Sequence, residues 1–399
     1  MLMHCVRLFI WSCAYLVYSH VAVAQVGQDQ LGAAQISEYL HLLKDKKVAL
    51  VVNQTATVGE QHLVDILLEK GVDVRVVFAP EHGFRGNKGA GETVLDGVDL
   101  STQLPIVSLY GKQKKPSAAM LEGIDVILFD IQDVGVRFYT YISTMHYVME
   151  AAAEFGIPMI ILDRPNPNIA HIAGPILDLE LQSFVGMHPI PVLHGLTVGE
   201  LALMIKGERW IANAESLSLT VVPVAHYSAA DTYELPIPPS PNLPNAAAIQ
   251  FYASLCLLEP TTFSVGRGTP FPFQMIGHPR IILSGNTVSI TPISTPYAAP
   301  YPKWQDQAIH AMLIKQTNPL LSGFDVSLIQ HAFTQSKLHN DPFFTSTDFF
   351  DKLAGTSELR MALGNRDKLK ALEQKWQIEL KAYKVKAEKY FLYARDASP

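Results

Sequence analysis

The sequence predicts an α/β protein built on a parallel β-sheet with helices covering both faces. Apolar segments rich in β-branched residues alternate with helical segments through the N-terminal half, a pattern typical of βαβ units. These segments are apolar throughout, as expected for strands buried on both faces. With 399 residues the chain is long enough for two domains. We expect the first over residues 36–186 and a smaller α/β domain over residues 187–399, with the boundary near Gly186.

The elements expected in the first domain follow in a regular order. Gly71 and Gly156 mark the ends of two helices, because glycine readily adopts the left-handed conformation that follows a helix. Each apolar run is too short for a helix and is bounded by turn-forming or polar residues, which favours a strand. We expect strands at 47–52, 73–78, 105–109, 125–129 and 158–162, and helices at 36–43, 61–70, 117–122 and 138–155.

The second half has a more mixed pattern. The sequence from Thr197 to Glu200 is a capping box, which predicts the start of a helix. Gly285 and Asn286 separate two short apolar runs, which favours a hairpin. We expect helices at 198–206, 304–315 and 363–390, a strand at 217–224, and hairpin strands at 280–283 and 287–290.

Residues 1–24 have the three parts of a secretory signal peptide. Arg7 supplies the positive charge, residues 8–18 are mostly apolar, and residues 22–24 (Ala-Val-Ala) form a cleavage site. The apolar run is too short and too interrupted to span a membrane, so we expect a periplasmic or secreted protein without stable membrane insertion. After cleavage the remaining cysteine is Cys256, in an apolar run, where a buried packing thiol is expected.

Composition and missing motifs exclude several classes of protein. The formal net charge of −6 does not favour nucleic acid or an anionic membrane as a partner. The glycine spacing does not match the dinucleotide-binding pattern, and no Walker A sequence, G-x-S-x-G elbow or H-E-x-x-H pair is present. Residues 130–135 resemble a calcium loop only in part, because the register and the closing glutamate are missing. Dinucleotide, nucleoside triphosphate, serine hydrolase and zincin functions are therefore disfavoured, and we expect no metal site in residues 130–135.

Polar side chains at strand ends give the strongest functional signal. Glu81 and His82 follow the second strand, just beyond Pro80, which cannot continue a β-ladder. The carboxyl ends of parallel strands lie on one edge of a sheet, where ligands bind in open α/β folds. We therefore expect the strand-end polar residues to converge there: Asn53, Glu81, His82, Asp130, Asp133, Asp163, Arg164 and Asn166.

Several longer strings are similar to one family. They include Pro80-Glu81-His82-Gly83-Phe84-Arg85-Gly86 and residues 53–55, 108–111, 130–141, 162–167, 194–197, 240–244 and 266–269. On these strings the chain resembles the exo-β-N-acetylmuramidases of glycoside hydrolase family 171, formerly a domain of unknown function, over residues 36–390. The chain departs from the family pattern at residues 259–262, where Pro260 and Thr262 replace a glycine and an asparagine.

The resemblance implies an exported glycosidase that releases terminal N-acetylmuramic acid from the non-reducing end of peptidoglycan fragments. It implies a Rossmann-like domain followed by a smaller α/β domain, with the active site in the cleft between them and no cofactor. The expected partners are peptidoglycan-derived disaccharides or muropeptides.

Cleavage of a glycoside usually takes two carboxyl groups. One acts as an acid, which needs a partly desolvated place that raises its pKa, and Glu81 is the first candidate. His82 is expected either to orient a carboxylate, to bind the acetamido group of the sugar, or to be a structural histidine. For the second carboxyl we favour Asp133, then Glu259, ahead of Asp130, Asp163 and Glu92.

The lactyl carboxylate of N-acetylmuramic acid calls for a cation, preferably arginine because of its fork geometry. Arg137, Arg164 and Arg267 lie on candidate cleft loops. Tyr139 and Tyr141 are two residues apart on an expected helix and do not share a face, so at most one is expected in the site. The remaining expected substrate-binding residues are Asn53, Asp163, Asn166 and Glu259, with Tyr110 as a further stacking candidate.

Two other functions use similar residues. A two-domain receptor that binds muropeptides without cleaving them also needs a cleft, arginines and aromatic rings, but it does not need a catalytic acid. An esterase or amidase acting on the same wall material is a third hypothesis, although no nucleophile elbow or zinc signature supports it.

Overall fold

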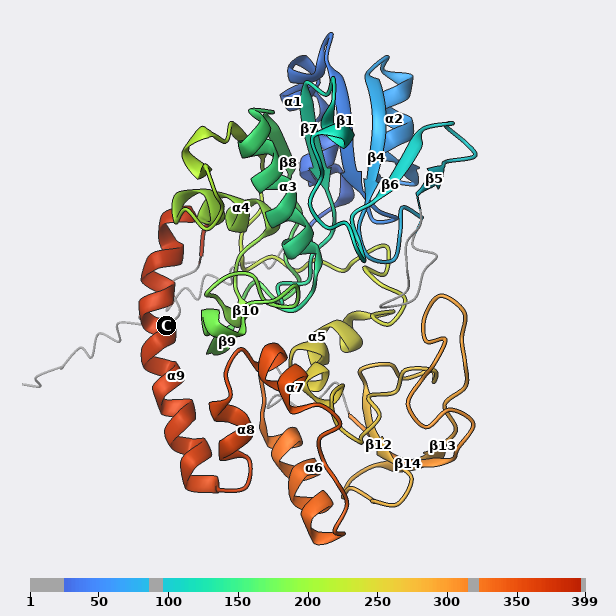
Figure 1. Ribbon diagram of the computed structural model, residues 1–399, viewed down its shortest axis with the longest axis vertical. Coiled ribbons are helices and arrows are strands. Elements are labelled where there is room, and N and C mark those ends of the chain that lie inside the picture. The colour runs from blue at the N-terminus through green and yellow to red at the C-terminus, as the bar shows by residue number, and fades with distance from the viewer. Residues whose placement is uncertain (1–24, 86–95, 315–322, 396–399) are drawn as a thin grey trace, which may run out of the picture.

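The structure is a computed structural model that describes residues 25–85, 96–314 and 323–395. The expected signal peptide, residues 1–24, and the candidate carboxyl of Glu92 lie outside the described residues. Figure 1 shows two parts stacked along the long axis. The upper part, here called the sheet part, surrounds a large β-sheet. The lower part contains a small sheet and several helices, and a long C-terminal helix runs along one side.

Seven strands form the large sheet within the described residues, in the order β11-β8-β7-β1-β4-β6-β5. All neighbours pair in parallel except β5, which is antiparallel to β6. Counted along the chain, the parallel strands have the 3-2-1-4-5-6 order of the Rossmann fold, so the predicted fold class is confirmed. The strands are β1 (Lys47–Val52), β4 (Asp73–Ala79), β5 (Gly97–Val98), β6 (Pro105–Ser108), β7 (Val126–Asp130), β8 (Met159–Leu162) and β11 (Leu219–Val222).

Helices cover both faces of this sheet. Leu50 of β1 belongs to the core cluster shared with α1 and α2, whereas Val51 belongs to the cluster shared with α3 and α4. Successive side chains of a strand point to opposite faces, so a strand that is apolar throughout needs a helical layer on each side. The helices are α1 (Ile36–Leu43), α2 (Leu63–Glu69), α3 (Tyr141–Phe155) and α4 (Val198–Gly207).

The large sheet takes its edge strand from beyond the expected domain boundary near Gly186. Strand β11 pairs in parallel with β8, Leu219 opposite Met159. The antiparallel pair of β9 (Ile172–Ile176) and β10 (Pro191–His194) precedes β11 in the chain. The sheet part therefore draws on residues on both sides of residue 186.

The lower part corrects two sequence-based predictions. Residues 309–313 form a strand rather than part of a helix, and this strand, β14, pairs with both β12 and β13. Residues 280–283 are not a strand, so the expected hairpin is wrong. A short apolar run is ambiguous between helix and strand, and here the pairing partners decide. The elements are β12 (Met275–His278), β13 (Thr287–Ile290), β14 (Ile309–Leu313), α5 (Ala246–Leu255), α6 (Ser327–Leu338), α7 (Thr347–Ala354), α8 (Glu358–Ala362) and α9 (Arg366–Ala387).

No helix in the described ranges is long and apolar enough to cross a membrane.

Short strands and 3-10 helices connect the longer elements. The expected helix over 138–155 begins only at Tyr141, and the three residues before it form a turn. The short elements are β2 (Thr57–Val58), β3 (Gln61–His62), and 3-10 helices at Gln28–Gln30, Gly32–Ala34, Ala119–Leu121, Leu179–Leu181, Ala214–Ser216, Cys256–Leu258 and Glu388–Tyr390.

Candidate functional site

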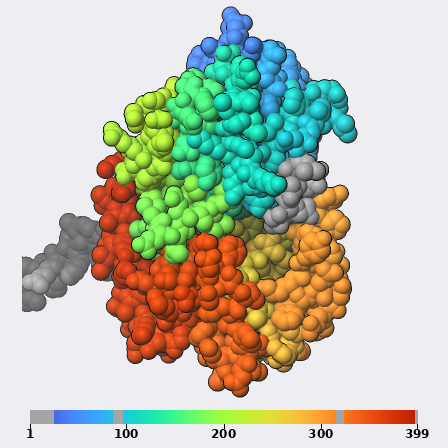
Figure 2. Space-filling model, viewed as in Figure 1, coloured from blue at the N-terminus to red at the C-terminus, as the bar shows by residue number. Residues whose placement is uncertain are grey.

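A cavity of about 440 Å³ lies where the sheet part meets the lower part. In Figure 2 the surface is hollowed between the two parts, and the yellow atoms of the α5 region form the bottom of the hollow. Loops at the carboxyl ends of the strands line one side, and α5 and the loops after it line the other. The polar lining residues include Glu81, His82, Tyr110, Tyr139, Thr140, Ser240, Asn242, Tyr252, Glu259 and Arg267.

Glu81 and His82 reach the cavity through a sharp turn after β4. His82 has φ +69° and Gly83 has φ +78°. For a residue with a Cβ this conformation costs about 1 kcal/mol, so the surrounding structure must hold it. Thr140 Oγ1 donates a hydrogen bond of 2.6 Å to Glu81 Oε2. Thr140 is the residue before α3, and the cavity-lining turn over residues 138–140 therefore fixes the orientation of the carboxylate.

Glu259 and Arg267 form the polar wall of the lower part. Glu259 follows the 3-10 turn that continues α5, and its Oε1 accepts a hydrogen bond of 2.7 Å from Arg267 Nε. The guanidinium also lies over the ring of Phe273, 4.9 Å from its centroid. Burial acts to lower the pKa of Arg267, but the neighbouring Glu259 outweighs it, and the pKa is raised. Arg267 therefore remains positively charged beside Glu259.

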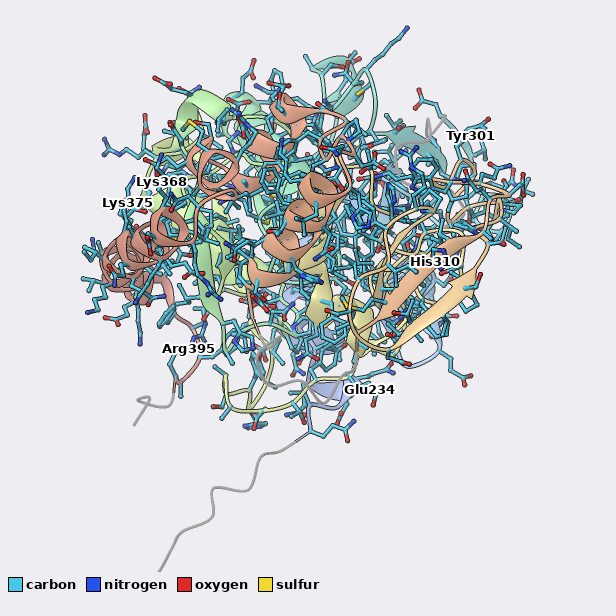
Figure 3. All side chains as sticks on the ribbon, turned by 90° about the horizontal axis from the view of Figure 1, so that it is seen from below. Glu234, Tyr301, His310, Lys368, Lys375 and Arg395 are labelled. Atoms are coloured by element: carbon cyan, nitrogen blue, oxygen red, sulfur yellow. The ribbon has the colours of Figure 1, made fainter. Side chains whose placement is uncertain are left out.

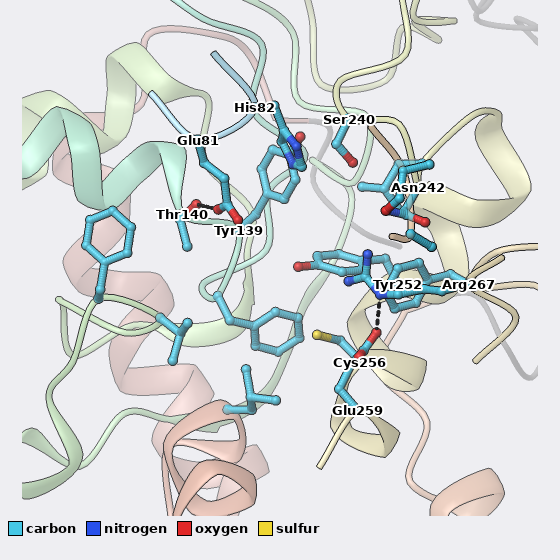
Figure 4. A pocket seen from close by; sticks show the side chains of 18 of the residues that line it. Glu81, His82, Tyr139, Thr140, Ser240, Asn242, Tyr252, Cys256, Glu259 and Arg267 are labelled. Carbon is cyan, nitrogen blue, oxygen red and sulfur yellow. Dashed lines mark hydrogen bonds and ion pairs between the residues drawn. The ribbon is translucent and has the colours of Figure 1, made fainter. Parts of the chain in front are cut away.

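Glu81 and Glu259 face the cavity from opposite sides. Figure 4 shows Glu81 with Thr140 on one side and Glu259 with Arg267 on the other.

Two tyrosines also line the cavity. The ring centroids of Tyr139 and Tyr252 are 5.9 Å apart, and the rings meet edge to face. Burial raises the pKa of both phenols, so they remain neutral hydrogen-bond donors at ordinary pH.

Cys256 lines the cavity but is buried. Burial, and after it the charge of Glu259, raises the pKa of its thiol. A thiol in such a place is not ionised and is a poor nucleophile.

The structure brings six of the predicted site residues to the cavity: Glu81, His82, Tyr110, Tyr139, Glu259 and Arg267. Tyr139 precedes α3, and its ring lies 4.8 Å from that of Tyr141, so the two rings touch although they were not expected to share a face. Tyr141 instead donates a hydrogen bond to Pro239 O and is not among the lining residues.

The other predicted site residues do not line this cavity. Most lie in a buried polar layer at the strand ends of the large sheet. Arg164 forms a two-pronged ion pair with Asp130, with Nε–Oδ1 and Nη2–Oδ2 distances of 2.5 and 2.9 Å. Asn53 accepts hydrogen bonds from the backbone and hydroxyl of Thr55. Asn166 donates to Leu196 O. The bonds of Arg164 and Asn166 tie neighbouring strand-end loops together, whereas those of Asn53 shape its own loop.

Asp163 is the centre of this layer. Its carboxylate accepts hydrogen bonds from Gly199 N and Thr197 Oγ1, at the beginning of α4, and from Tyr393 Oη near the C-terminus. Burial raises the pKa of Asp163 to about 6, although hydrogen bonds from Tyr393 and Thr197 act to lower it. These contacts connect β8, α4 and the end of the chain.

Asp133, the favoured second carboxyl, is also buried away from the cavity. Its Oδ2 accepts a hydrogen bond of 2.6 Å from Gly135 N and lies 3.7 Å from His194 Nε2. Arg137 is fully buried and donates to three backbone carbonyls, those of Pro175, Ile190 and Leu353. Neither side chain is placed to touch a ligand in this cavity.

Sequence reasoning gave no role to Thr140, Ser240, Asn242 and Tyr252. The proline-rich stretch from 236 to 244 excludes helix and central strand, which was the available signal for a shaped loop carrying Ser240 and Asn242. Thr140 lies in the family-like string 130–141, but its role depends on a contact with Glu81, 59 residues away in the sequence, which no local pattern shows. In the described part of the chain, no group of three or more His, Cys, Asp or Glu side chains is arranged to hold a metal ion.

Two family models match the chain. The N-terminal model of the exo-beta-N-acetylmuramidase NamZ matches residues 48–247, and its C-terminal model matches residues 250–393. The two matched ranges therefore meet within α5.

Solved structures and a curated relative agree with these matches. The chain is 37% identical over 390 residues to the peptidoglycan beta-N-acetylmuramidase NamZ of Bacillus subtilis strain 168, covering 92% of this chain and 91% of that protein. A crystal structure of a DUF1343 family protein from Bacteroides fragilis superposes with a TM-score of 0.82 at 39% identity, covering 92% of this chain and 99% of the other. A second such protein from the same organism gives 0.78 at 29% identity, with coverages of 91% and 98%.

Family models that span both parts of the chain, and a curated relative that is similar over almost the whole length, confirm the resemblance drawn from the sequence motifs. The chain belongs to the exo-β-N-acetylmuramidase NamZ family.

Proposed function

We propose that this protein is an exo-acting glycosidase that releases β-linked N-acetylmuramic acid from the non-reducing end of peptidoglycan fragments. One observation carries the proposal: in a member of this family, Glu81 and the Glu259–Arg267 pair face each other across one cavity. Two carboxyl groups on opposite sides of a sugar-sized cavity are what glycoside cleavage usually requires.

Glu81 is proposed to be the general acid. Its carboxyl is half-buried at the cavity wall, and Thr140 holds one oxygen. In its protonated form it gives a proton to the glycosidic oxygen as the bond to the anomeric carbon breaks. His82, next to it and also lining the cavity, is proposed to bind the acetamido group of the sugar.

Glu259 is proposed to be the second carboxyl, in place of the favoured Asp133. Of the carboxylates within the described residues, Glu81 and Glu259 line the cavity. The hydrogen bond from Arg267 Nε holds the Glu259 carboxyl group in place at the cavity wall. An ionised carboxylate opposite the acid serves either as the nucleophile or as the base that activates water, and the configuration of the released sugar distinguishes the two.

Arg267 is proposed to bind the lactyl carboxylate that distinguishes N-acetylmuramic acid from N-acetylglucosamine. Its Nε is hydrogen-bonded to Glu259, and no hydrogen bond joins its Nη atoms to the described residues. Each Nη atom has one N–H bond that is parallel to one on the other Nη atom. This pair of donors fits the two oxygens of a carboxylate in the two-pronged geometry that arginine favours.

Export is part of the proposal. It rests on the sequence of residues 1–24 alone, and the mature chain is proposed to begin at Gln25 in the periplasm or outside the cell. N-terminal sequencing of the protein recovered from the producing cells tests this directly.

The decisive experiment compares a chromogenic β-N-acetylmuraminide with the matching β-N-acetylglucosaminide. We expect release from the first alone, and a loss of at least a thousandfold in kcat for Glu81→Gln with a disaccharide substrate, with binding retained. Release from neither substrate would contradict the activity, and equal release from both would contradict a requirement for the lactyl group. Near-normal turnover by Glu81→Gln would remove Glu81 from the role of acid.

A further inference from the structure

Tyr301 is unusual because it is 92% exposed and yet lines the cavity. Figure 3 shows it at the outer edge of the molecule, far from Lys368 and Lys375 of α9. It belongs to none of the hydrophobic core clusters of the described residues. Packing of the protein therefore does not explain a large aromatic ring in water at this place.

The backbone that carries Tyr301 is held firmly. Pro300 and Pro302 flank it, and each fixes its own φ angle. Ser294 Oγ donates a hydrogen bond of 2.7 Å to Pro300 O. On the other side, Lys303 Nζ donates to the carbonyls of Glu259, Thr261 and Phe263. The ring is thus presented from an ordered position at little further entropic cost on binding.

The same loop is tied to the cavity wall. Asn242 Nδ2 donates a hydrogen bond of 2.6 Å to Ala298 O, and both residues line the cavity. Lys303, two residues after Tyr301, binds the carbonyl of Glu259. The loop that carries Tyr301 is therefore tied to the cavity wall and to the backbone of Glu259, which carries the proposed second carboxyl.

An exo-acting enzyme binds the end of a chain inside its cavity and leaves the rest of the chain at the mouth. The cavity, about 440 Å³, is near the small end of ligand pockets, about 300–1,000 Å³. It suits a terminal sugar with its acetamido and lactyl groups, and the next sugar then lies at the rim. Tyr301 is the aromatic residue of that rim with the greatest exposure.

We propose that Tyr301 forms part of the subsite for the sugar that follows the terminal N-acetylmuramic acid, with its ring against the apolar face of that pyranose. A rigid aromatic ring with a broad apolar face suits the apolar face of a pyranose. This subsite rests on the proposed function, because it presumes that the terminal sugar is bound beside Glu81.

The loop offers a matched control. Tyr297 lies four residues earlier and is 56% exposed, but it is not among the lining residues. It stands in a turn closed by hydrogen bonds between Thr295 and Ala299. Replacing Tyr297 by alanine removes an exposed ring from the same loop without touching the cavity.

The test uses two substrates and the purified full-length mature chain. The first is the disaccharide of N-acetylmuramic acid β-linked to N-acetylglucosamine. The second is the β-fluoride of N-acetylmuramic acid, whose leaving group is a single atom that cannot reach Tyr301. For Tyr301→Ala we expect kcat/KM on the disaccharide to fall about tenfold, mostly through KM, and to change less than twofold on the fluoride. Tyr301→Phe and Tyr297→Ala should behave as the wild type.

The outcomes separate this subsite from the proposed function. If the wild type turns over both substrates and Tyr301→Ala loses nothing on the disaccharide, the subsite is overturned and the glycosidase stands. Equal losses on both substrates, or an equal loss in Tyr297→Ala, also overturn it, because they indicate a general effect on the loop. If the wild type turns over neither substrate, the proposed function fails and the subsite fails with it.

Discussion

The buried polar layer at the strand ends and the polar wall of the lower part contain the same kinds of residues. They differ in whether the hydrogen bonds of those residues are already complete within the protein. In the layer, Arg164 and Asp130 are almost fully buried and bind each other with two hydrogen bonds. In the wall, Arg267 and Glu259 are each 24% exposed at the side chain and share a single hydrogen bond. The first pair is complete without a ligand, whereas the second has hydrogen-bonding capacity left for one.

The difference shows that position at the carboxyl edge of a sheet is not enough to make a residue part of a site. A polar side chain at that edge can bind a ligand. It can instead form hydrogen bonds to the backbone of neighbouring strand-end loops, whose polar groups would otherwise be buried without partners. Asp163 and Asn166 do the second task, through hydrogen bonds to neighbouring loops. Glu81 is set apart by a loop that projects it into the cavity.

The largest expected effect contrasts Glu259 with Asp133. Glu259→Gln should lower kcat on the disaccharide about a thousandfold, within the range for a residue acting in proton transfer, with little change in stability because the pair is partly exposed. Asp133→Ala should leave kcat within a few-fold and lower the free energy of unfolding, since it removes the oxygen that accepts the buried hydrogen bond of Gly135 N. Kinetics and urea unfolding of both variants measure this, and the reverse result would restore Asp133 as the second carboxyl.

The next largest effect is on stability. Arg164→Ala leaves the buried carboxylate of Asp130 without its partner and should lower the free energy of unfolding by about 4 kcal/mol. Activity per folded molecule should be retained, because Arg164 does not line the cavity.

Should the alanine variant not fold, the double variant Asp130→Asn with Arg164→Met is the control. Removing both charges leaves neither partner unpaired and should be far less destabilising. A folded Arg164→Ala protein with normal stability and lost activity would instead place Arg164 in the site.

The fold was predictable to the extent that local pattern decides it. Val48 to Val52 read as a strand buried on both faces, because every position is apolar, and the structure has it at the centre of the sheet. Ile309 to Leu313 form a mostly apolar run interrupted by His310. The prediction of a helix there was wrong, because only the strands paired on either side distinguish strand from helix. The local sequence pattern limits each segment to helix or strand, and pairing with strands that are distant in the sequence decides between the two.

The same limit applies to the candidate site. Glu81 was identifiable because Pro80 ends its strand and a glycine follows. Asp133 and Arg137 carried equally strong motifs, but their side chains turn inward, to Gly135 N and to three carbonyls. Nothing in the local sequence reveals which way a side chain turns at a strand end.

A smaller effect on the free energy of unfolding tests the hydrogen bond between the buried polar layer and the C-terminal segment. Tyr393→Phe removes the hydroxyl that donates to Asp163 and accepts from Val224 N, and should lower the free energy of unfolding by about 2 kcal/mol, as for a hydrogen bond to a charged group. Tyr390→Phe is the matched control: its hydroxyl binds Glu208 nearer the surface and its loss should cost about 0.5 kcal/mol. Equal costs in thermal or urea unfolding would contradict a special role for Asp163.

The smallest effect concerns the pH dependence of the scaffold. His146 of α3 is buried and lies 3.0 Å from His188, Nδ1 to Nε2. Burial lowers the pKa of His146 to about 4, against a raising influence from Glu150. Because the unfolded chain binds its proton near pH 6.5, the unfolded state takes up more protons than the folded state between pH 6.5 and 4. Stability is therefore full above this window and is lost as the pH falls through it.

His146→Gln removes that proton uptake while keeping a hydrogen-bonding side chain beside His188. Between pH 6.5 and 5.5 the wild type should lose about 1 kcal/mol more unfolding free energy than the variant. Urea unfolding of both proteins at the two pH values gives the difference directly. Equal losses would mean that His146 is already able to take up a proton in the folded protein. Polar groups buried in the scaffold would then still be able to bind a further proton. The contrast between a polar layer whose hydrogen bonds are complete and a cavity wall with unused hydrogen-bonding groups would not hold at α3.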